Sequence, residues 1–191
     1  MKNIFDVEIN YMHDERIKDA TRKLVEMLPE YFFVVPASST GKYHPKCSNV
    51  EGGLVNHTKL AVRFAKEMFD NAMVFTKFSE HDQDLIILAL IMHDGFKHGL
   101  THEKYVRFDH PIISAEFVRD YAEEVGLTSE EGKTLYDIIS SHMGVFNTSQ
   151  YSKVVLPLPK TTMQKFVHLC DDLSSKKFVD AEFDENHNMI Y

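Results

Sequence analysis

The segment Leu85–Asp94, LIILALIMHD, decides how the rest of the chain is interpreted. Its first eight residues are all apolar, so a helix here would be apolar on every side and buried in the centre of the fold. The segment ends in a histidine and an aspartate, and burying an ionised carboxylate is very costly without a compensating partner. It therefore predicts either a metal site or a hydrogen-bonded ion pair, and this dipeptide alone favours the ion pair.

Helical patterns flank this segment on both sides, and no segment alternates convincingly like a strand. Ser79 is expected to cap the central helix, and capping boxes are expected at Thr128 with Glu131 and at Thr161 with Gln164. We therefore predict an all-α fold, with helices at residues 14–28, 54–69, 80–97, 111–125, 128–142 and 161–179. Residues 36–53, 99–108 and 143–160 are expected to be loops, and residues 31–35 are either extended or a continuation of the first helix.

Length, charge and cysteine content limit the class of protein. The chain has 191 residues, with 21 basic and 29 acidic residues, a net charge of −8 and two cysteines. This length fits one domain, with a core at about residues 44–179 and an acidic tail at 180–191 that is either mobile or a docking segment. The charge argues against long nucleic acid as a partner, and no apolar run approaches the roughly twenty residues of a membrane span. We expect a cytoplasmic protein, because no signal peptide or disulfide framework is visible.

The chain holds eleven histidines, an unusually large supply of metal ligands and acid–base groups. Some of them, with two aspartates, lie at expected helix ends or on apolar helix faces. This ordered set is His57, His93, Asp94, His110, His142 and Asp171. The set favours a metal site over an ion pair, although spacing alone does not show that its members converge.

The set resembles the pattern H…HD…H…H…D of the HD-domain metal-dependent phosphohydrolases. The flanking motifs GGLxxHT at residues 52–58 and LCDxLxS at 169–175 match as well, and the resemblance runs from about His44 to Lys177. It is closest to HD domains of the bacterial 3′→5′ exoribonuclease type and to small stand-alone relatives, some of them phage-encoded. Many relatives have HDxGK where this chain has HDGFK, so the resemblance does not determine the geometry of the turn after Asp94. Only 56 residues precede His57, so we expect no nucleic-acid module like that of the full exoribonucleases, and this expectation weakens the case for a processive ribonuclease.

The resemblance implies a helical bundle of about six or seven helices with a metal site in its centre. It implies that His57, His93, Asp94 and Asp171 hold a first divalent ion, and that Asp94 bridges to a second ion held by His110 and His142. The donor types suit Mn, Fe, Co, Ni or Zn, and Mg is a further candidate. The implied reaction is attack of metal-bound hydroxide on a phosphoester, with Asp94 and Lys97 as catalytic residues.

The expected substrate is a small phosphorylated molecule, either a nucleotide or a short oligonucleotide. Alternatives in the same fold are a nucleoside mono- or triphosphate phosphohydrolase and a non-catalytic nucleotide-binding domain. Candidate substrate contacts are His44, Lys97, His98 and His102. The sequence does not indicate the oligomeric state.

The remaining candidates have simpler interpretations. Asp172 competes with Asp171 as the ligand; neighbours on a helix point about 100° apart, and the family pattern favours Asp171. Cys170 is expected in the core, and His168 either supports a ligand or simply packs. His13, His81 and His187 lie in polar stretches and are expected to be solvated. Position alone suggests a polar pocket near His142, lined by Ser140, Ser141, Asn147, Thr148, Ser149 and Tyr151.

Overall fold

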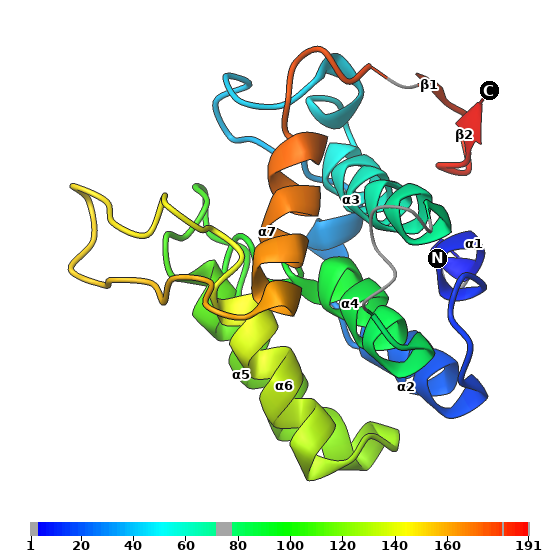
Figure 1. The fold of residues 1–191 in the computed structure, drawn as a ribbon. Helices are drawn as coiled ribbons and strands as arrows, with labels where there is room; N and C mark the ends of the chain where they lie inside the picture. The colour runs from blue at the N-terminus through cyan, green and yellow to red at the C-terminus, as the bar shows by residue number, and fades with distance from the viewer. Residues whose placement is uncertain (1–3, 72–77, 181, 191) are drawn as a thin grey trace.

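The computed structural model describes residues 4–71, 78–180 and 182–190, and within these ranges the chain forms seven α-helices and almost no sheet. The helices are α1 (Asp6–Ile9), α2 (Glu15–Glu26), α3 (Gly53–Asp70), α4 (Glu80–Met92), α5 (His110–Val125), α6 (Ser129–Ser140) and α7 (Thr162–Ser174). Two 3-10 helices, η1 (Glu30–Phe33) and η2 (Lys46–Ser48), and the strands β1 (Glu182–Phe183) and β2 (Met189–Ile190) complete the fold (Figure 1). The prediction of an all-α fold is confirmed.

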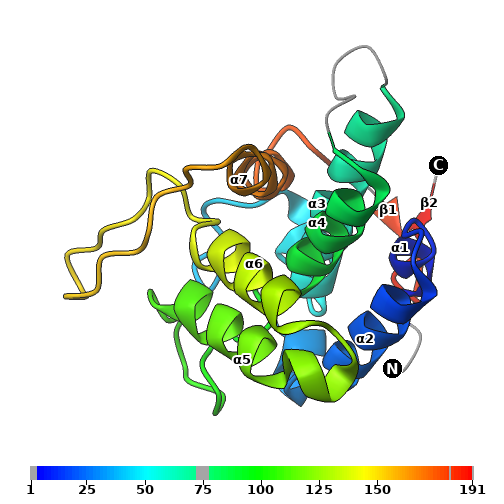
Figure 2. The ribbon, with the colours of Figure 1, turned by 60° about the horizontal axis from the view of Figure 1, so that its bottom comes forward.

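Helix α4 is the central element, as its uniform apolar character predicts. Every residue from Asp84 to Met92 is buried, and α4 contacts α2, α3, α6 and α7. Helices α5 and α6 run side by side in both ribbon views (Figures 1 and 2) and make the most extensive helix pair. The C-terminal end of α4 therefore lies where several other helices begin or end.

The helix starts follow the capping signals. The capping boxes at Thr128 with Glu131 and at Thr161 with Gln164 are both present, and Ser79 caps α4 together with Asp82. Helix α5 ends at Gly126, whose φ of 104° is left-handed and favours glycine. Residues 31–35, for which the sequence allowed either an extended or a helical structure, begin within the 3-10 helix η1.

Four helices end earlier than predicted, at Glu26, Met92, Ser140 and Ser174, whereas the sequence suggested residues 28, 97, 142 and 179. At the last three of these ends, side chains that follow the helix bind its last carbonyl groups. Ser141 Oγ donates to the Asp137 carbonyl, at 2.7 Å, and Ser175 Oγ donates to the Asp172 carbonyl, also at 2.7 Å. Such local side-chain bonds compete with continued helix.

The turn after α4 packs closely around Gly95, so a larger residue there would have to displace Leu28. A Cβ atom there would lie 2.6 Å from Leu28 Cδ2. In the sequence HDGFK, Gly95 allows the turn to pack against Leu28. The turn is therefore formed with the glycine directly after Asp94, one position earlier than in the HDxGK of many relatives.

The two ends of the chain differ from expectation. Helix α1 was not predicted, and the tail forms a small antiparallel hairpin in which Glu182 pairs with Ile190 and Phe183 with Met189. The expectation of no strands is wrong here, because the Asp184 carboxylate accepts from the backbone N–H groups of Asn186 and Asn188 and closes the turn. Residues 181 and 191 of the predicted tail, and residues 1–3 of the segment tested for a signal peptide, lie outside the described residues. No described helix has the length and apolar character needed to cross a membrane.

Candidate metal centre

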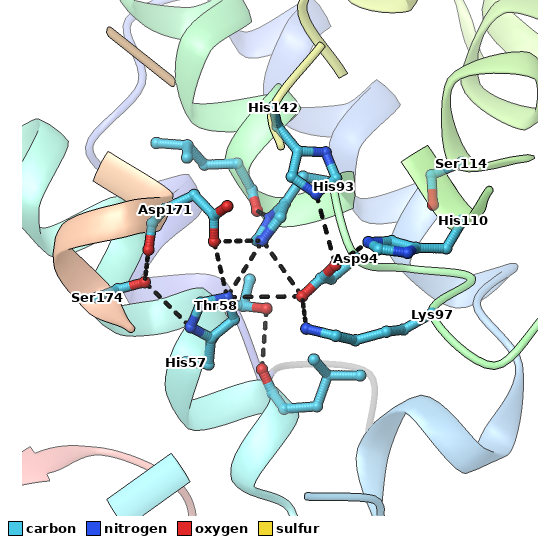
Figure 3. Close-up of polar contacts among 12 residues, drawn as sticks. His57, Thr58, His93, Asp94, Lys97, His110, Ser114, His142, Asp171 and Ser174 are labelled. Carbon is cyan, nitrogen blue, oxygen red and sulfur yellow. Dashed lines mark hydrogen bonds and ion pairs between the residues drawn. The ribbon is translucent and has the colours of Figure 1, made fainter. Parts of the chain in front are cut away.

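The six residues of the ordered histidine–aspartate set converge at one point of the bundle (Figure 3). The structure takes His57 from the start of α3, His93 and Asp94 from the turn after α4, His110 from the start of α5, His142 from the turn after α6 and Asp171 from α7. Three overlapping groups among them, each with its ligand atoms within 4.8 Å of one another, could hold a metal ion. Helices distant in sequence therefore bring the set together.

The Asp94 carboxylate divides the cluster into two halves. Its Oδ1 lies 2.9 Å from His110 Nε2 and 3.7 Å from His142 Nε2. Its Oδ2 lies 3.5 Å from His57 Nε2 and 3.4 Å from His93 Nε2. Asp171 Oδ1 joins the second half, at 3.1 Å from His57 Nε2 and 3.4 Å from His93 Nε2.

All four histidines are oriented by their Nδ1 atoms. The Nδ1–H groups of three of them donate to the carbonyl three residues earlier: His93 to Leu90 at 2.6 Å, His110 to Arg107 at 2.6 Å and His142 to Ile139 at 2.8 Å. The fourth bond involves Ser174, whose hydroxyl donates to the Asp171 carbonyl and therefore accepts from His57 Nδ1 at 3.0 Å. Each ring thus directs Nε2 at the centre, as metal-binding histidines do.

This donor set fits a divalent ion. His110 Nε2 is buried and has no hydrogen-bond partner, although it lies 2.9 Å from Asp94 Oδ1. The Nε2 atoms of His57 and His93 lie only 3.3 Å apart, an arrangement that needs a cation or a proton between two lone pairs. Imidazole and carboxylate donors together suit transition metals and zinc.

The centre is almost sealed and strongly charged. The five histidine and aspartate residues other than Asp171 are at most 3% exposed, whereas the side chain of Asp171 is 16% exposed. Burial opposes ionisation of both carboxyl groups, but Lys97, His93 and His110 hold the pKa of Asp94 well below its usual value, and His57 and His93 do the same for the pKa of Asp171. Burial likewise lowers the pKa of His142 to about 3. The two carboxylates are therefore ionised, and they attract cations.

Lys97 lies inside the centre, where its ammonium group contacts Asp94 Oδ2. The residue is 8% exposed. The sequence predicted a lysine near the metal site that contacts a phosphate; the structure brings it to the carboxylate between the two halves of the cluster. Its charge partly balances Asp94 there.

The candidate substrate contacts separate into two groups. The His44 ring packs edge-on against the His57 ring, with centroids 4.8 Å apart, and its buried Nδ1 has no hydrogen-bond partner. Burial lowers the pKa of His44 to about 2, so the ring is neutral. The structure does not bring His98 and His102 into the cluster: both rings pack against Tyr31, and His98 Nδ1 donates to the Glu103 carbonyl at 2.8 Å.

The neighbours of the ligand on α7 take different roles. Asp172 pairs with Lys176 at 2.7 Å, and Asp171 faces the cluster. Cys170 is fully buried in the core, as predicted. His168 Nδ1 donates to the His142 carbonyl at 2.7 Å, so it supports the chain next to a cluster histidine.

Two histidines expected to be solvated also bind distant residues, although the side chain of His13 remains 39% exposed. His13 Nδ1 lies 3.0 Å from the buried Asp84 carboxylate, and His187 Nδ1 donates to Asn56 Oδ1 at 2.7 Å. Their partners are 71 and 131 residues away in the sequence, which explains why the local sequence did not indicate these contacts. His81 is exposed as expected, at 51% of its side chain.

The proposed polar pocket near His142 has a different explanation. The hydroxyls of Ser140 and Ser141 bond carbonyl groups of the last turn of α6, and the Asn147 amide donates to the Leu156 carbonyl. These groups shape the end of the helix and the following loop. Sequence reasoning also missed Ser174, which orients His57; its position three residues after Asp171 was the available signal.

Comparison with known proteins agrees with this geometry. No curated protein and no solved structure gave a significant match. The family model described as HD domain matches residues 52–176, about two thirds of the chain and a range that contains all six residues of the cluster. The chain therefore belongs to the HD domain family, whose members are generally metal-dependent phosphohydrolases.

Proposed function

We propose that the cluster binds one or two divalent metal ions and hydrolyses a phosphoester of a nucleotide or short oligonucleotide. The observation that carries this proposal is the set of four Nε2 atoms, each fixed by an Nδ1 hydrogen bond, around two ionised carboxylates. A structural ion pair would not need four histidines with their acceptor nitrogens facing one point.

The halves of the cluster define the ligands. One ion would be held by His57, His93, Asp94 and Asp171, because the Nε2 atoms of the two histidines face Asp94 Oδ2 and Asp171 Oδ1. His110 and His142 would hold a second ion together with Asp94 Oδ1. Asp94 would then contact both ions, which makes it the residue on which the site depends most.

The chemistry divides between the ion and the chain. A bound divalent ion lowers the pKa of water and neutralises charge that develops on phosphoryl oxygens. Lys97 supplies a positive charge next to Asp94, and it is placed to bind a phosphate oxygen as a point charge when an ion takes over its role at the carboxylate. His44 offers a neutral ring nitrogen beside His57 for a hydrogen bond to the substrate. Burial of the centre excludes bulk water and strengthens these interactions.

The direct test is metal analysis of the purified protein, combined with a screen of nucleotides and short RNA and DNA. Release of inorganic phosphate, of nucleoside monophosphate or of triphosphate separates the reaction types. Metal-free protein should be inactive, and divalent ions should restore activity. A protein that binds nucleotide but hydrolyses none of these substrates with any added metal would support the non-catalytic alternative.

Substitution of His110 tests the second ion. His110→Ala should halve the metal content while the helical fold, followed by circular dichroism, is retained. His102→Ala is the matched control, since that ring packs on Tyr31 away from the cluster, and its metal content should be unchanged. An equal metal content in His110→Ala and wild type would indicate a mononuclear site.

A further inference from the structure

We propose that three loops around the metal centre form a binding surface for a short single-stranded oligonucleotide. This surface, called the loop face, consists of residues 36–52, 99–109 and 143–160. The inference rests on the proposed function and chooses among its substrates, favouring a chain of several nucleotides over a mononucleotide.

Connectivity places all three loops at the centre. The first loop runs into the start of α3 and reaches His57, the second ends next to His110, and the third follows His142 directly. In Figure 1 the three loops lie on the left and upper left of the bundle. A substrate bound at the centre and longer than one nucleotide would therefore meet these loops first.

The charge of the loop face is opposite to that of the rest of the protein. The three loops contain six basic and three acidic residues, whereas the rest of the chain contains 15 basic and 26 acidic residues. Two of the acidic residues, Glu103 and Asp109, are already bound to Arg107 at 2.7 Å. The loop face is therefore a positive region on a negative molecule, and it attracts an anion locally.

The lysines of the loop face have no acidic partners. Five lysines there are exposed, and none forms an ion pair with any described residue: Lys42, Lys46, Lys104, Lys153 and Lys160. Elsewhere the lysines are often paired, as Lys18 is with Glu15, Lys66 with Asp70 and Lys176 with Asp172. Unpaired lysines spread over three loops fit an anion with several separated charges, whereas a single phosphate at the centre already has Lys97.

Exposed aromatic rings lie on the same loops as these lysines, and three of the four rings lie within two residues of a lysine. The residues are Tyr43, Tyr105, Phe146 and Tyr151, which are 71%, 64%, 60% and 89% exposed. Tyr43 follows Lys42, Tyr105 follows Lys104 and Tyr151 lies two residues before Lys153. Flat rings on which bases stack, interleaved with lysines that contact phosphates, are the features that bind single strands without sequence preference.

The same observations limit the length of the ligand. Beyond the loop face the protein carries 11 more acidic than basic residues, and a long polyanion would be repelled there. The surface thus fits a few nucleotides that lead into the metal centre. An acidic peptide would satisfy the lysines but would leave the exposed rings without stacking partners.

Binding measurements test this proposal. The full-length Asp94→Ala variant, in which cleavage is disabled, is mixed with a fluorescent six-nucleotide single strand, and the dissociation constant is measured by anisotropy at several salt concentrations. We expect the single strand to bind at least about tenfold more tightly than a mononucleotide, a duplex of the same length or a polyglutamate peptide of matched charge.

Two sets of variants locate the surface. The triple variant Lys42→Gln, Lys104→Gln and Lys153→Gln should weaken binding and reduce the slope of log K against log salt by about 2, since each phosphate contact to a single strand contributes about 0.7. Lys18→Gln, Lys66→Gln and Lys176→Gln together make the matched control, which removes the same charge elsewhere and should leave the slope unchanged. Tyr151→Ala should weaken binding about tenfold, and circular dichroism checks that the fold is kept.

The outcomes separate this inference from the proposed function. Equal affinity for mononucleotide and single strand, equal loss in both triple variants, or equally tight binding of polyglutamate would each overturn the loop-face proposal, even if wild-type protein hydrolyses nucleotides. Conversely, lysine-dependent binding of single strands by a protein that holds no metal and cleaves nothing would support the loop face and overturn the proposed function.

Discussion

Asp84 in α4 and Asp94 in the turn after α4 are both buried, but they have different partners and different roles. The Asp84 carboxylate accepts hydrogen bonds from the backbone N–H groups of His13 and Asp14, both at 2.8 Å, and contacts His13 Nδ1 at 3.0 Å. The Asp94 carboxylate is surrounded by side chains instead, namely Lys97 and the Nε2 atoms of four histidines.

The difference shows that burial of a carboxylate does not by itself indicate function. Asp84 is completely satisfied by fixed backbone donors, so it joins the start of α2 to α4. Asp94 faces nitrogens whose ring N–H groups are already used on the opposite side of each ring. A buried carboxylate that faces ring nitrogens with no N–H left to donate indicates a bound ligand. A buried carboxylate that accepts from backbone N–H groups indicates a structural role.

The largest effect should follow removal of the Asp94 carboxylate. Asp94→Ala should lose its bound metal and reduce kcat/KM at least about a thousandfold, the factor that corresponds to roughly 4 kcal/mol of transition-state stabilisation. Metal analysis and phosphate release measure both quantities. Wild-type metal content in this variant would refute the ligand assignment.

Asp84→Ala should produce the opposite pattern. Two partly buried backbone N–H groups lose their acceptor, so the free energy of unfolding should fall by about 2 kcal/mol, as measured by urea unfolding of the metal-free protein. Metal content per folded molecule should stay the same. The neighbouring Asp82→Ala is the control, since it removes only part of the capping box at Ser79 and should cost about 1 kcal/mol. Loss of metal without loss of stability in Asp84→Ala would contradict the structural role assigned to Asp84.

A third buried acid adds a pH test. Glu131 binds Arg16 through both of its oxygens, at 2.7 and 2.9 Å, and this bond, opposed by burial, lowers the pKa of Glu131 to about 2. Because the folded-state pKa lies below the unfolded value of 4.5, the pair stabilises the fold above that pH and loses its effect as pH falls from about 4.5 to 2. The contribution should be about 1 kcal/mol, because the Arg16 side chain is 42% exposed.

Urea midpoints of the metal-free protein at pH 7, 4, 3 and 2 measure this dependence. Arg16→Ala should reduce stability at pH 7 and differ little from wild type near pH 2. A constant difference between the two proteins over the whole pH range would show that Arg16 acts through packing alone.

The smallest effect is expected at Asp172, the neighbour of the proposed ligand Asp171. Asp172→Asn breaks only a partly exposed pair with Lys176 on the same helix and should cost at most about 0.5 kcal/mol, with full metal content. Asp171→Asn, an identical change one residue earlier, should lose metal. Similar metal loss in both variants would mean that Asp172 also contributes to metal binding, contrary to its pairing with Lys176 in the structure.

Much of the fold could be predicted because its signals are local. The apolar run at 85–92, the capping boxes and the glycine at 126 each act within a few residues, and the structure confirms the helices that they predict. The helix ends were harder to predict, because serine and histidine side chains that bond nearby carbonyl groups stop the helices before the apolar pattern ends. The tail hairpin was missed because its strands are only two residues long.

For the candidate site, the sequence determined which residues are available and in what order: four histidines and two aspartates near helix ends, matching the family pattern. Periodicity could not decide between Asp171 and Asp172, and it could not separate His44, which packs on the cluster, from His98 and His102, which do not. Nor could it identify His13 as the partner of Asp84. Only the tertiary structure decided these points, because helical periodicity specifies which face of a helix is apolar, whereas contacts between residues dozens of positions apart depend on how the helices pack.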